Sequence, residues 1–232
     1  MPLSAWLLST LSVTAVSSTF ALFLCGIPIC RRIAALGTAD TTPGAPFLVA
    51  FISCILWTQY GFTREDEVII AINFIGVATQ TAYVLFYYSW SSRQQKRRLR
   101  KILGTELLAI IAIEYMVHAE GWKESGENIL GIVCVILNVT NMGAPLLAVG
   151  EVLRQGSTSM LPLPLCTANL VVSLQWLLYG TLMEDRVIQV PNVIATCLSV
   201  LQLSLFAIFP RNGSAALVKG VGVKLDESAY LI

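Results

Sequence analysis

Residues 57–76 read WTQYGFTREDEVIIAINFIG, and residues 176–195 read WLLYGTLMEDRVIQVPNVIA. The second stretch repeats the first at an offset of 119 residues, with the Trp, the Tyr-Gly pair, the Glu-Asp pair and the Asn in the same places. The same offset also aligns Gly37 with Gly156 and Pro43 with Pro162, without a gap. Tryptophan, proline, glycine and asparagine seldom coincide by chance in one register. The chain therefore contains an internal repeat, which is a constraint on the whole fold.

The composition excludes a soluble globular protein. Of the 232 residues 56% are hydrophobic and 12% are charged, whereas a soluble domain has about 25% charged residues. A helix needs about 20 mostly apolar residues to cross a hydrocarbon core of about 30 Å. The runs that meet or approach this length predict seven transmembrane helices: Ala5–Ile29, Ala45–Phe62, Val68–Trp90, Ile102–Val117, Ile129–Gly150, Leu161–Met183 and Val187–Phe209.

The repeat gives these predicted helices an order. An offset of 119 maps the first three onto the last three and leaves the fourth unpaired. We therefore expect an all-α integral membrane protein with seven transmembrane helices arranged as 3+1+3. The fourth helix carries the chain back across the membrane, so the two triple-helix repeats should be parallel, an arrangement that transporters use to build a central substrate site. The predicted divisions are 1–95 for the first repeat, 96–124 for a basic loop and the linker helix, 125–210 for the second repeat and 211–232 for a flexible tail.

The distribution of basic residues predicts the orientation. One side of the predicted topology carries most of them: Arg31, Arg32, Arg93, Lys96, Arg97, Arg98, Arg100, Lys101, Arg154, Arg211, Lys219 and Lys224. The opposite side carries Arg64, Lys123 and Arg186. The positive-inside rule then places the amino terminus outside the cell and the carboxyl terminus in the cytoplasm. A net charge of +1 gives no electrostatic reason to expect a nucleic-acid partner.

Two asparagines are candidates for binding a polar solute. Asn73 and Asn192 occupy equivalent places, one to two turns inside the third helix of each repeat. Each amide offers two donors and an acceptor, which could replace the water that hydrates a polyhydroxylated solute. The alternative is that each amide only bonds a neighbouring helix, as intramembrane asparagines often do.

The aromatic residues near these asparagines allow two interpretations. Trp57 and Trp176, with Tyr60 and Tyr179 one turn further out, could anchor the helices at the membrane interface. Indole faces beside amides also suit a sugar, whose C–H faces stack while its hydroxyls accept and donate hydrogen bonds. The sequence does not decide between them.

Prolines recur near the predicted cytoplasmic ends of helices in both repeats. Pro43, Pro46, Pro145, Pro162 and Pro164 could be hinges, because a proline in a helix removes a hydrogen bond and bends the axis. They could also simply mark helix starts, where proline is harmless.

Acidic residues inside the apolar runs are confined to the linker helix. Glu106 and Glu114 lie there, with His118 at its outer end, and we expect pairing or interfacial snorkelling for these acids. The repeat helices carry no central acid, so ion coupling has no obvious residues. We also find no nucleophile, base or metal cluster in the membrane core, and we expect neither an enzyme nor a metal or other cofactor.

The motifs together resemble those of the SWEET sugar transporters. The resemblance rests on Trp57-Thr-Gln-Tyr60-Gly61 with Asn73-Phe-Ile-Gly76, and in the second repeat on Gly143-Ala-Pro145, Ser157 to Pro162, Trp176 to Gly180 and Val190-Pro191-Asn192. It covers the chain to about residue 210, and it implies a facilitative, bidirectional sugar uniporter that works by alternating access.

The resemblance also implies roles for individual residues. The asparagines matching Asn73 and Asn192 bind the sugar, and residues matching Trp57 and Trp176 enclose it. Tyr60, Tyr179 and Asp185 are similar to the outer gate of the family. Pro46, Pro145 and Pro162 match three of the four hinge prolines. The fourth hinge position, in the first helix, is Gly26 here, with Pro28 two residues later. This departure predicts a looser or displaced hinge.

Two other classes share part of this plan. A seven-helix receptor has the same helix count and an outside amino terminus, but it has no reason to keep a repeat. A PQ-loop transporter of another solute, coupled to protons, shares the 3+1+3 plan, but it would show Pro-Gln dipeptides and an acid in a repeat helix. We expect a monosaccharide such as glucose as the substrate and the lipid bilayer as the surroundings. We leave homo-oligomerisation open. We expect residence in the plasma membrane, with the Golgi as the alternative.

Overall fold

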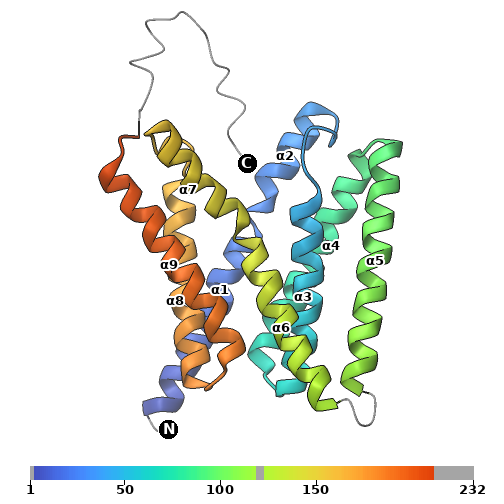
Figure 1. Cartoon of the computed structure of the whole chain (residues 1–232), viewed down its shortest axis with the longest axis vertical. Coiled ribbons are helices and arrows are strands. Elements are labelled where there is room, and N and C mark those ends of the chain that lie inside the picture. The colour runs from blue at the N-terminus through green and yellow to red at the C-terminus, as the bar shows by residue number, and fades with distance from the viewer. Residues whose placement is uncertain (1–2, 119–122, 212–232) are drawn as a thin grey trace, which may run out of the picture. The chain divides into compact units, whose positions relative to one another are not determined.

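All regular structure in the described residues, 3–118 and 123–211 of the computed structural model, is helical. The predicted tail is described only at Arg211, since residues 212–232 lie outside these ranges. Figure 1 shows the helices, which follow one another as α1 (Leu3–Phe23), α2 (Gly26–Leu36), α3 (Ala45–Arg64), α4 (Glu67–Trp90), α5 (Arg93–His118), α6 (Lys123–Asn141), α7 (Gly143–Gln155), α8 (Leu163–Leu182) and α9 (Arg186–Ile208).

These helices correspond to the seven predicted spans. The first and the fifth span are each broken into two helices. The second, third, sixth and seventh spans have the predicted ends to within two residues. The first is formed by α1 and α2, and the fifth by α6 and α7. Both broken spans continue five or more residues past the predicted carboxyl end, to Leu36 and Gln155, because a helix need not stop where its apolar stretch stops.

A proline accounts for the place of each break. Pro28 is the third residue of α2, and Pro145 is the third residue of α7. Proline has no N–H, and its ring clashes with the carbonyl four residues earlier, so the preceding turn cannot remain a regular α-helix. The N-cap residues that precede the second pieces, Cys25 and Met142, accordingly have ψ angles of −12° and 0°.

The linker helix α5 begins earlier than predicted. The basic residues from Arg93 to Lys101 form its first turns, where the sequence pattern predicted a loop. Lysine, arginine and glutamine are good helix formers, and Ser92 starts the helix by accepting from the Gln95 N–H on its hydroxyl. Six spans in the described residues are long and apolar enough to cross a bilayer. The charges of its first turns, together with Glu106 and Glu114, keep α5 out of this set, and only residues 102–117 of α5 are mostly apolar.

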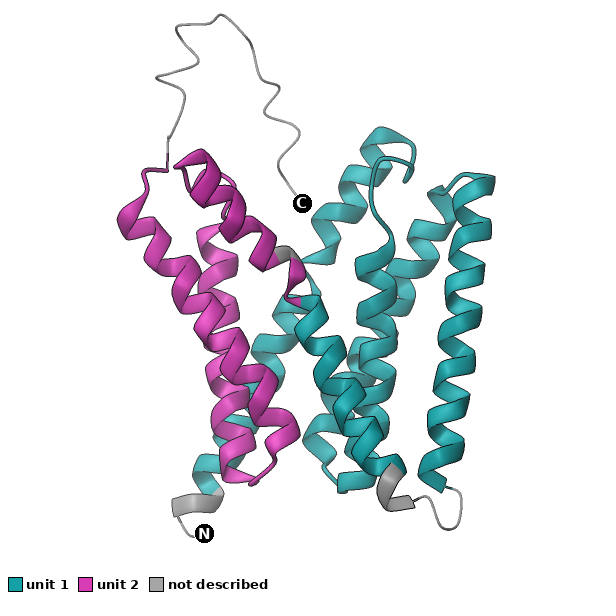
Figure 2. Cartoon of the chain, in the orientation of Figure 1, with its two compact units in different colours: residues 1–141 teal, residues 142–232 magenta. Residues whose placement is uncertain are grey.

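Two compact units divide the chain between Asn141 and Met142 (Figure 2). In the first unit α4 packs against α1, α2 and α3, while α6 packs against α3 and α5. In the second unit α9 packs against α7 and α8. The third helix of each repeat is therefore the one around which the other two are arranged. This division by contacts falls inside the fifth predicted span, and it is distinct from the repeat boundary predicted from the sequence.

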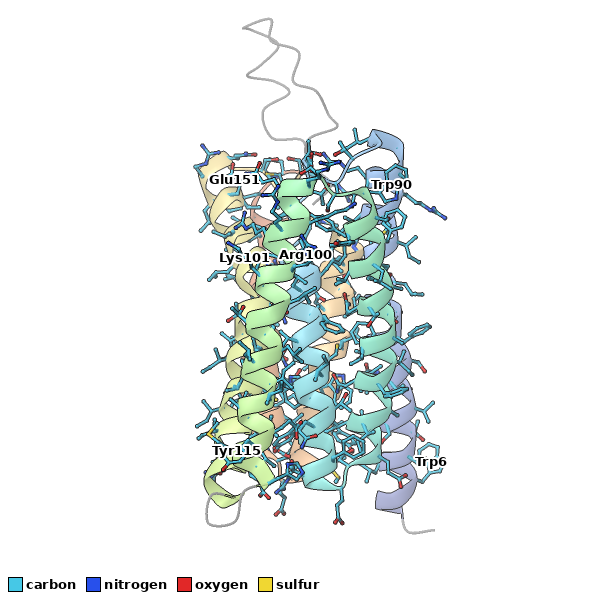
Figure 3. The ribbon with its side chains drawn as sticks, turned by 90° about the vertical axis from the view of Figure 1, so that its right-hand side faces the viewer. Trp6, Trp90, Arg100, Lys101, Tyr115 and Glu151 are labelled. Atoms are coloured by element: carbon cyan, nitrogen blue, oxygen red, sulfur yellow. The ribbon has the colours of Figure 1, made fainter. Side chains whose placement is uncertain are left out.

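Each unit has a small apolar core, and much apolar surface remains outside it. The core of the first unit includes Ile33, Phe47, Leu48, Tyr83 and Tyr87, and that of the second includes Val149, Val152, Leu161, Cys166 and Leu205. Along α5, Leu108 is 69% exposed and Tyr115 is 74% exposed. Figure 3 shows Tyr115 near one end of this helix and the charged Arg100 and Lys101 toward the other. Such apolar faces are stable when hydrocarbon covers them.

Candidate functional site

The second and third helices of the first repeat are joined by a tight turn. Helix α3 ends at Arg64, and Glu65 has a left-handed φ of 53°. The N–H of Glu65 bonds the Phe62 carbonyl at 3.3 Å, and the N–H of Asp66 bonds the Gly61 carbonyl at 2.9 Å. This pair of bonds is the Schellman arrangement, which satisfies the last carbonyls of a helix.

The second repeat forms the same turn from the matching residues. Glu184 has a φ of 55°, and its N–H bonds the Thr181 carbonyl at 3.2 Å, while the N–H of Asp185 bonds the Gly180 carbonyl at 2.8 Å. The internal repeat predicted from the sequence is therefore present in the backbone conformation.

The aspartate of each turn caps the next helix. One oxygen of Asp66 accepts from the N–H groups of Val68 and Ile69, both at 3.0 Å. One oxygen of Asp185 accepts from Val187 and Ile188 at 2.9 and 3.3 Å. Both carboxylates are buried. Asp185, singled out as a gate residue, thus also has a structural role as the N-cap of α9. Asp66 is not among the predicted gate residues, although the repeat aligns it with Asp185.

A glycine lets the two helices approach closely beside each turn. A Cβ built on Gly61 would lie 2.8 Å from Ile70 Cγ1 and 3.0 Å from the Ile70 backbone nitrogen. A Cβ on Gly180 would lie 2.9 Å from Ile188 Cβ and 3.2 Å from the Gln189 nitrogen. Side chains cannot be accommodated at such distances without moving α4 or α9. The aromatic residues one turn before each glycine are therefore held close to the start of the third helix.

The aromatic residues form one edge-to-face pair in each repeat. The rings of Trp57 and Tyr60 are 5.5 Å apart, and those of Trp176 and Tyr179 are 5.4 Å apart. Trp57 is 8% exposed, and the two tyrosines are also buried. Trp176 is half-buried. Anchors at the membrane interface would project outward, so this burial favours a role inside the protein over the anchor interpretation.

The two asparagines make the same hydrogen bond. Asn73 Nδ2 donates to the Ile69 carbonyl at 2.9 Å, and Asn192 Nδ2 donates to the Ile188 carbonyl at 2.7 Å. Each amide is tied to its own helix, and no bond to a neighbouring helix is present for either within the described residues. Both side chains are half-buried. The amide oxygen and one N–H of each asparagine are thus left for another group.

The four hinge positions all lie at helix starts. Pro46 is the second residue of α3, and Pro162 is the N-cap of α8. Gly26 is the first residue of α2, and Pro145 is the third residue of α7. A missing N–H is harmless in the first turn of a helix. Pro46 and Pro162 therefore fit the simpler interpretation of a helix start, whereas Gly26 and Pro145 lie beside the breaks within two predicted spans.

The acids of the linker helix differ from each other. Glu114 pairs with His118, with 3.5 Å between Oε2 and Nδ1, which is the first of the two expected alternatives, pairing or snorkelling. Glu106 has a buried Oε2 with no hydrogen-bond partner among the described residues, so the expected pairing does not hold there. No group of histidine, cysteine and acidic residues that could hold a metal ion is found in the described part of the chain.

Comparison with known proteins identifies the family. A family model described as "Sugar efflux transporter for intercellular exchange" matches residues 9–95 and again residues 128–214. The starts of the two matches, residues 9 and 128, are 119 residues apart, which is the offset of the repeat. The chain belongs to the SWEET family. Membership in the SWEET family sets aside the receptor and PQ-loop alternatives.

Individual SWEET relatives cover most of the chain. It is 36% identical to "Sugar transporter SWEET1" of Drosophila pseudoobscura pseudoobscura over 98% of this chain and 99% of that protein. It is 38% identical to "Sugar transporter SWEET1" of Caenorhabditis elegans over 88% of this chain and 66% of that protein. The fold is similar to a solved eukaryotic SWEET transporter, with a TM-score of 0.78 and 22% identity over 86% of this chain and 95% of that chain. The 3+1+3 arrangement of seven helices is thereby confirmed.

The glycines beside the two turns generate a prediction. Gly61→Ala and Gly180→Ala should each lower the stability of the detergent-solubilised protein by about 1–3 kcal/mol, because the added methyl group overpacks a close helix contact. Thermal unfolding followed by tryptophan fluorescence measures this change. Gly104→Ala in α5 and Gly150→Ala in α7 are matched controls, since a Cβ at either position meets no atom within 4 Å. Equal unfolding temperatures for the four variants would contradict the prediction.

Proposed function

We propose that the chain is a facilitative, bidirectional carrier of a monosaccharide such as glucose that works by alternating access. The observation that carries the proposal is a group of one tryptophan, one tyrosine and one asparagine that is present in both repeats. Each asparagine has donor and acceptor capacity left beyond its one bond to its own helix. A carrier that operates in both directions needs no energy-coupling residues, and the relatives named above are sugar transporters. We propose transport as the activity, without catalysis and without a cofactor.

The asparagines support sugar binding through the groups that they leave free. The bond from Nδ2 to the helix carbonyl fixes each side chain in one orientation. The remaining N–H and the amide oxygen can donate to and accept from a sugar hydroxyl, which has both capacities. Such orientation before binding reduces the loss of side-chain entropy when the sugar arrives. We therefore assign Asn73 and Asn192 to the substrate site.

The aromatic residues support a division between contact and gating. Trp57 and Trp176 present flat apolar surfaces suited to the C–H faces of a pyranose, and we assign them to sugar contact. Tyr60 and Tyr179 lie one turn nearer the tight turn in each repeat, beside the capping aspartates, so we assign them with Asp185 to an outer gate. Pro46, Pro145, Pro162 and Gly26 are proposed as the hinges of the opposite end.

The orientation is part of the proposal. The excess of lysine and arginine after the odd-numbered spans supports an extracellular amino terminus and a cytoplasmic carboxyl terminus. We propose the plasma membrane as the site of action, with the Golgi as the alternative. An epitope tag at the amino terminus, accessible to antibody on intact cells, would support both statements.

Transport without proton coupling is the first functional prediction. In proteoliposomes holding the full chain, labelled glucose should equilibrate across the membrane in both directions and should not accumulate when a pH gradient is imposed. The reason is that the third helix of each repeat carries no acid beyond its first turn. Accumulation above the external concentration, driven by the pH gradient alone, would exclude a uniporter and would direct attention to Glu106.

The second functional prediction concerns the asparagines. Asn73→Ala and Asn192→Ala should each weaken glucose binding by roughly ten- to a hundredfold, because lost hydrogen bonds in a dry site cost about 1–3 kcal/mol. Folding and surface delivery should be unchanged. Thr79→Ala is the matched control, since its hydroxyl also bonds a carbonyl of α4, that of Ile75 at 2.8 Å. An asparagine variant that transports like the control would return that residue to a structural role.

The third functional prediction concerns the size of the sugar. Trp57→Ser should admit sucrose, whereas wild type and Trp57→Phe should prefer glucose by about tenfold or more, because a second ring overpacks the site by about 1–3 kcal/mol. Trp57 is buried, so its truncation also costs stability, about 3–5 kcal/mol for a full loss of the ring. Competitive uptake of both sugars is therefore compared per folded molecule. Equal uptake of sucrose and glucose by wild type would show that the size argument is wrong.

A further inference from the structure

At the break between α1 and α2, the Phe23 carbonyl loses the N–H that it would bond in a regular helix. Pro28 has no N–H to give to the Leu24 carbonyl, four residues earlier. The Ile27 N–H bonds Leu24 instead, at 3.0 Å. In a regular helix the same N–H would bond the carbonyl of Phe23. The Phe23 carbonyl is therefore released from the helix.

A side chain of α4 supplies the missing donor. The hydroxyl of Tyr83 donates to the Phe23 carbonyl at 2.9 Å. Tyr83 is 8% exposed, and an unbonded carbonyl in such surroundings would be destabilising. This bond joins residues 60 positions apart in the sequence, and it ties the end of α1 to the third helix of the repeat.

The ring of Tyr83 occupies the space beside Gly26. A Cβ at Gly26 would lie 2.5 Å from Tyr83 Cε2 and 2.7 Å from Cζ. The ring cannot readily move away, because its hydroxyl is bonded to Phe23 and its centroid lies 5.6 Å from the ring centroid of Phe47. Glycine is thus required at this hinge position by its neighbour, which gives a physical reason for the departure from proline.

In the second repeat the equivalent pair is also in contact, but at a different carbonyl, because the equivalent of Phe23, Met142, keeps the Leu146 N–H as its donor at 3.0 Å. At the offset of 119, Gly26 corresponds to Pro145 and Tyr83 corresponds to Gln202. Gln202 Nε2 donates to the Pro145 carbonyl at 3.1 Å, and Gln202 is 4% exposed. In the first repeat the donor is the large side chain of Tyr83, which lies beside a glycine. In the second repeat the donor is the smaller side chain of Gln202, which bonds a proline carbonyl. In both, the third helix bonds a carbonyl at the break of the first helix.

We propose that Tyr83 is a positioning residue for the hinge of the first span. The proposal rests on the proposed function, transport by alternating access. The Tyr83 hydroxyl takes the place of the Ile27 N–H at the Phe23 carbonyl in the bent form, and straightening of the span returns that carbonyl to the Ile27 N–H. The carbonyl thus exchanges one donor for another, and the hydroxyl favours the bent form.

The consequence is measurable in the asymmetry of transport. In a passive carrier Vmax/KM is equal in the two directions, so the ratio of KM for entry to KM for exit depends on the rates at which the carrier changes form. Tyr83→Phe removes the hydroxyl and keeps the ring. We expect this ratio to change by about tenfold, which corresponds to about 1.4 kcal/mol between the two forms. A loss of folded protein alone lowers Vmax in both directions and leaves both KM values unchanged.

The measurement uses glucose entry and exit in cells that lack their own sugar carriers, where all copies of the full chain share one orientation. Tyr88→Phe is the matched control, a partly buried tyrosine of the same helix whose ring lies beside α5, with its centroid 5.2 Å from Lys96 Nζ. An unchanged KM ratio in Tyr83→Phe would overturn the role of the hydroxyl. Absence of glucose transport by wild type would instead refute the proposed function, so the two failures are distinguishable.

Replacing the Gly26 and Tyr83 pair with the residues of the second repeat tests the steric role of the Tyr83 ring. Gly26→Pro alone should reduce transport at least tenfold, because Tyr83 fills the space that the proline ring needs. Combining Gly26→Pro with Tyr83→Gln reproduces the pair of the second repeat, and it should restore most of the lost transport per folded molecule. If the combined variant is folded and no more active than Gly26→Pro alone, or if Gly26→Pro alone transports like wild type, the pairing is wrong.

Discussion

Inside a bilayer a backbone N–H or C=O has no water to bond, so the chain must satisfy every such group itself. This constraint makes each span helical, and it also determines what happens where a span ends or breaks. The turns at Glu65 and Glu184 return their N–H groups to the preceding helix. The aspartates that follow accept the first N–H groups of the next helix. Side chains of α4 and α9 then reach the carbonyls at the breaks. The duplicated features of the fold are mostly devices for backbone hydrogen bonding.

Most of the fold could be predicted from the sequence because length and apolarity alone determine a transmembrane helix. The ends of α3, α4, α8 and α9 follow closely from the apolar runs. The breaks in the first and fifth spans were not predicted as such, since proline can either bend a helix or begin one. The helical basic segment at the start of α5 was predicted as a loop, because hydropathy marks where hydrocarbon ends and is blind to a helix that continues into the headgroups.

The candidate site was partly predictable for a different reason. Duplication of Trp57, Tyr60 and Asn73 at an offset of 119 drew attention to them without any knowledge of contacts. It could not reveal that each asparagine bonds its own helix, because that depends on the side-chain rotamer. It also could not reveal Tyr83 and Gln202, because unlike residues at equivalent positions lower the apparent similarity of the repeats. Their bonds to the first helix of each repeat become visible only when the partner carbonyl of each side chain is known.

The shortness of the tight turns has a consequence for biosynthesis. Only two residues separate α3 from α4, and only three separate α8 from α9. A connection of this length cannot hold the second helix at the membrane surface while the first one crosses. We therefore expect each pair to leave the translocation channel as one helical hairpin. In this pathway the hairpin, and not the single helix, is the unit that partitions into lipid, and the third helix of each repeat enters beside its partner.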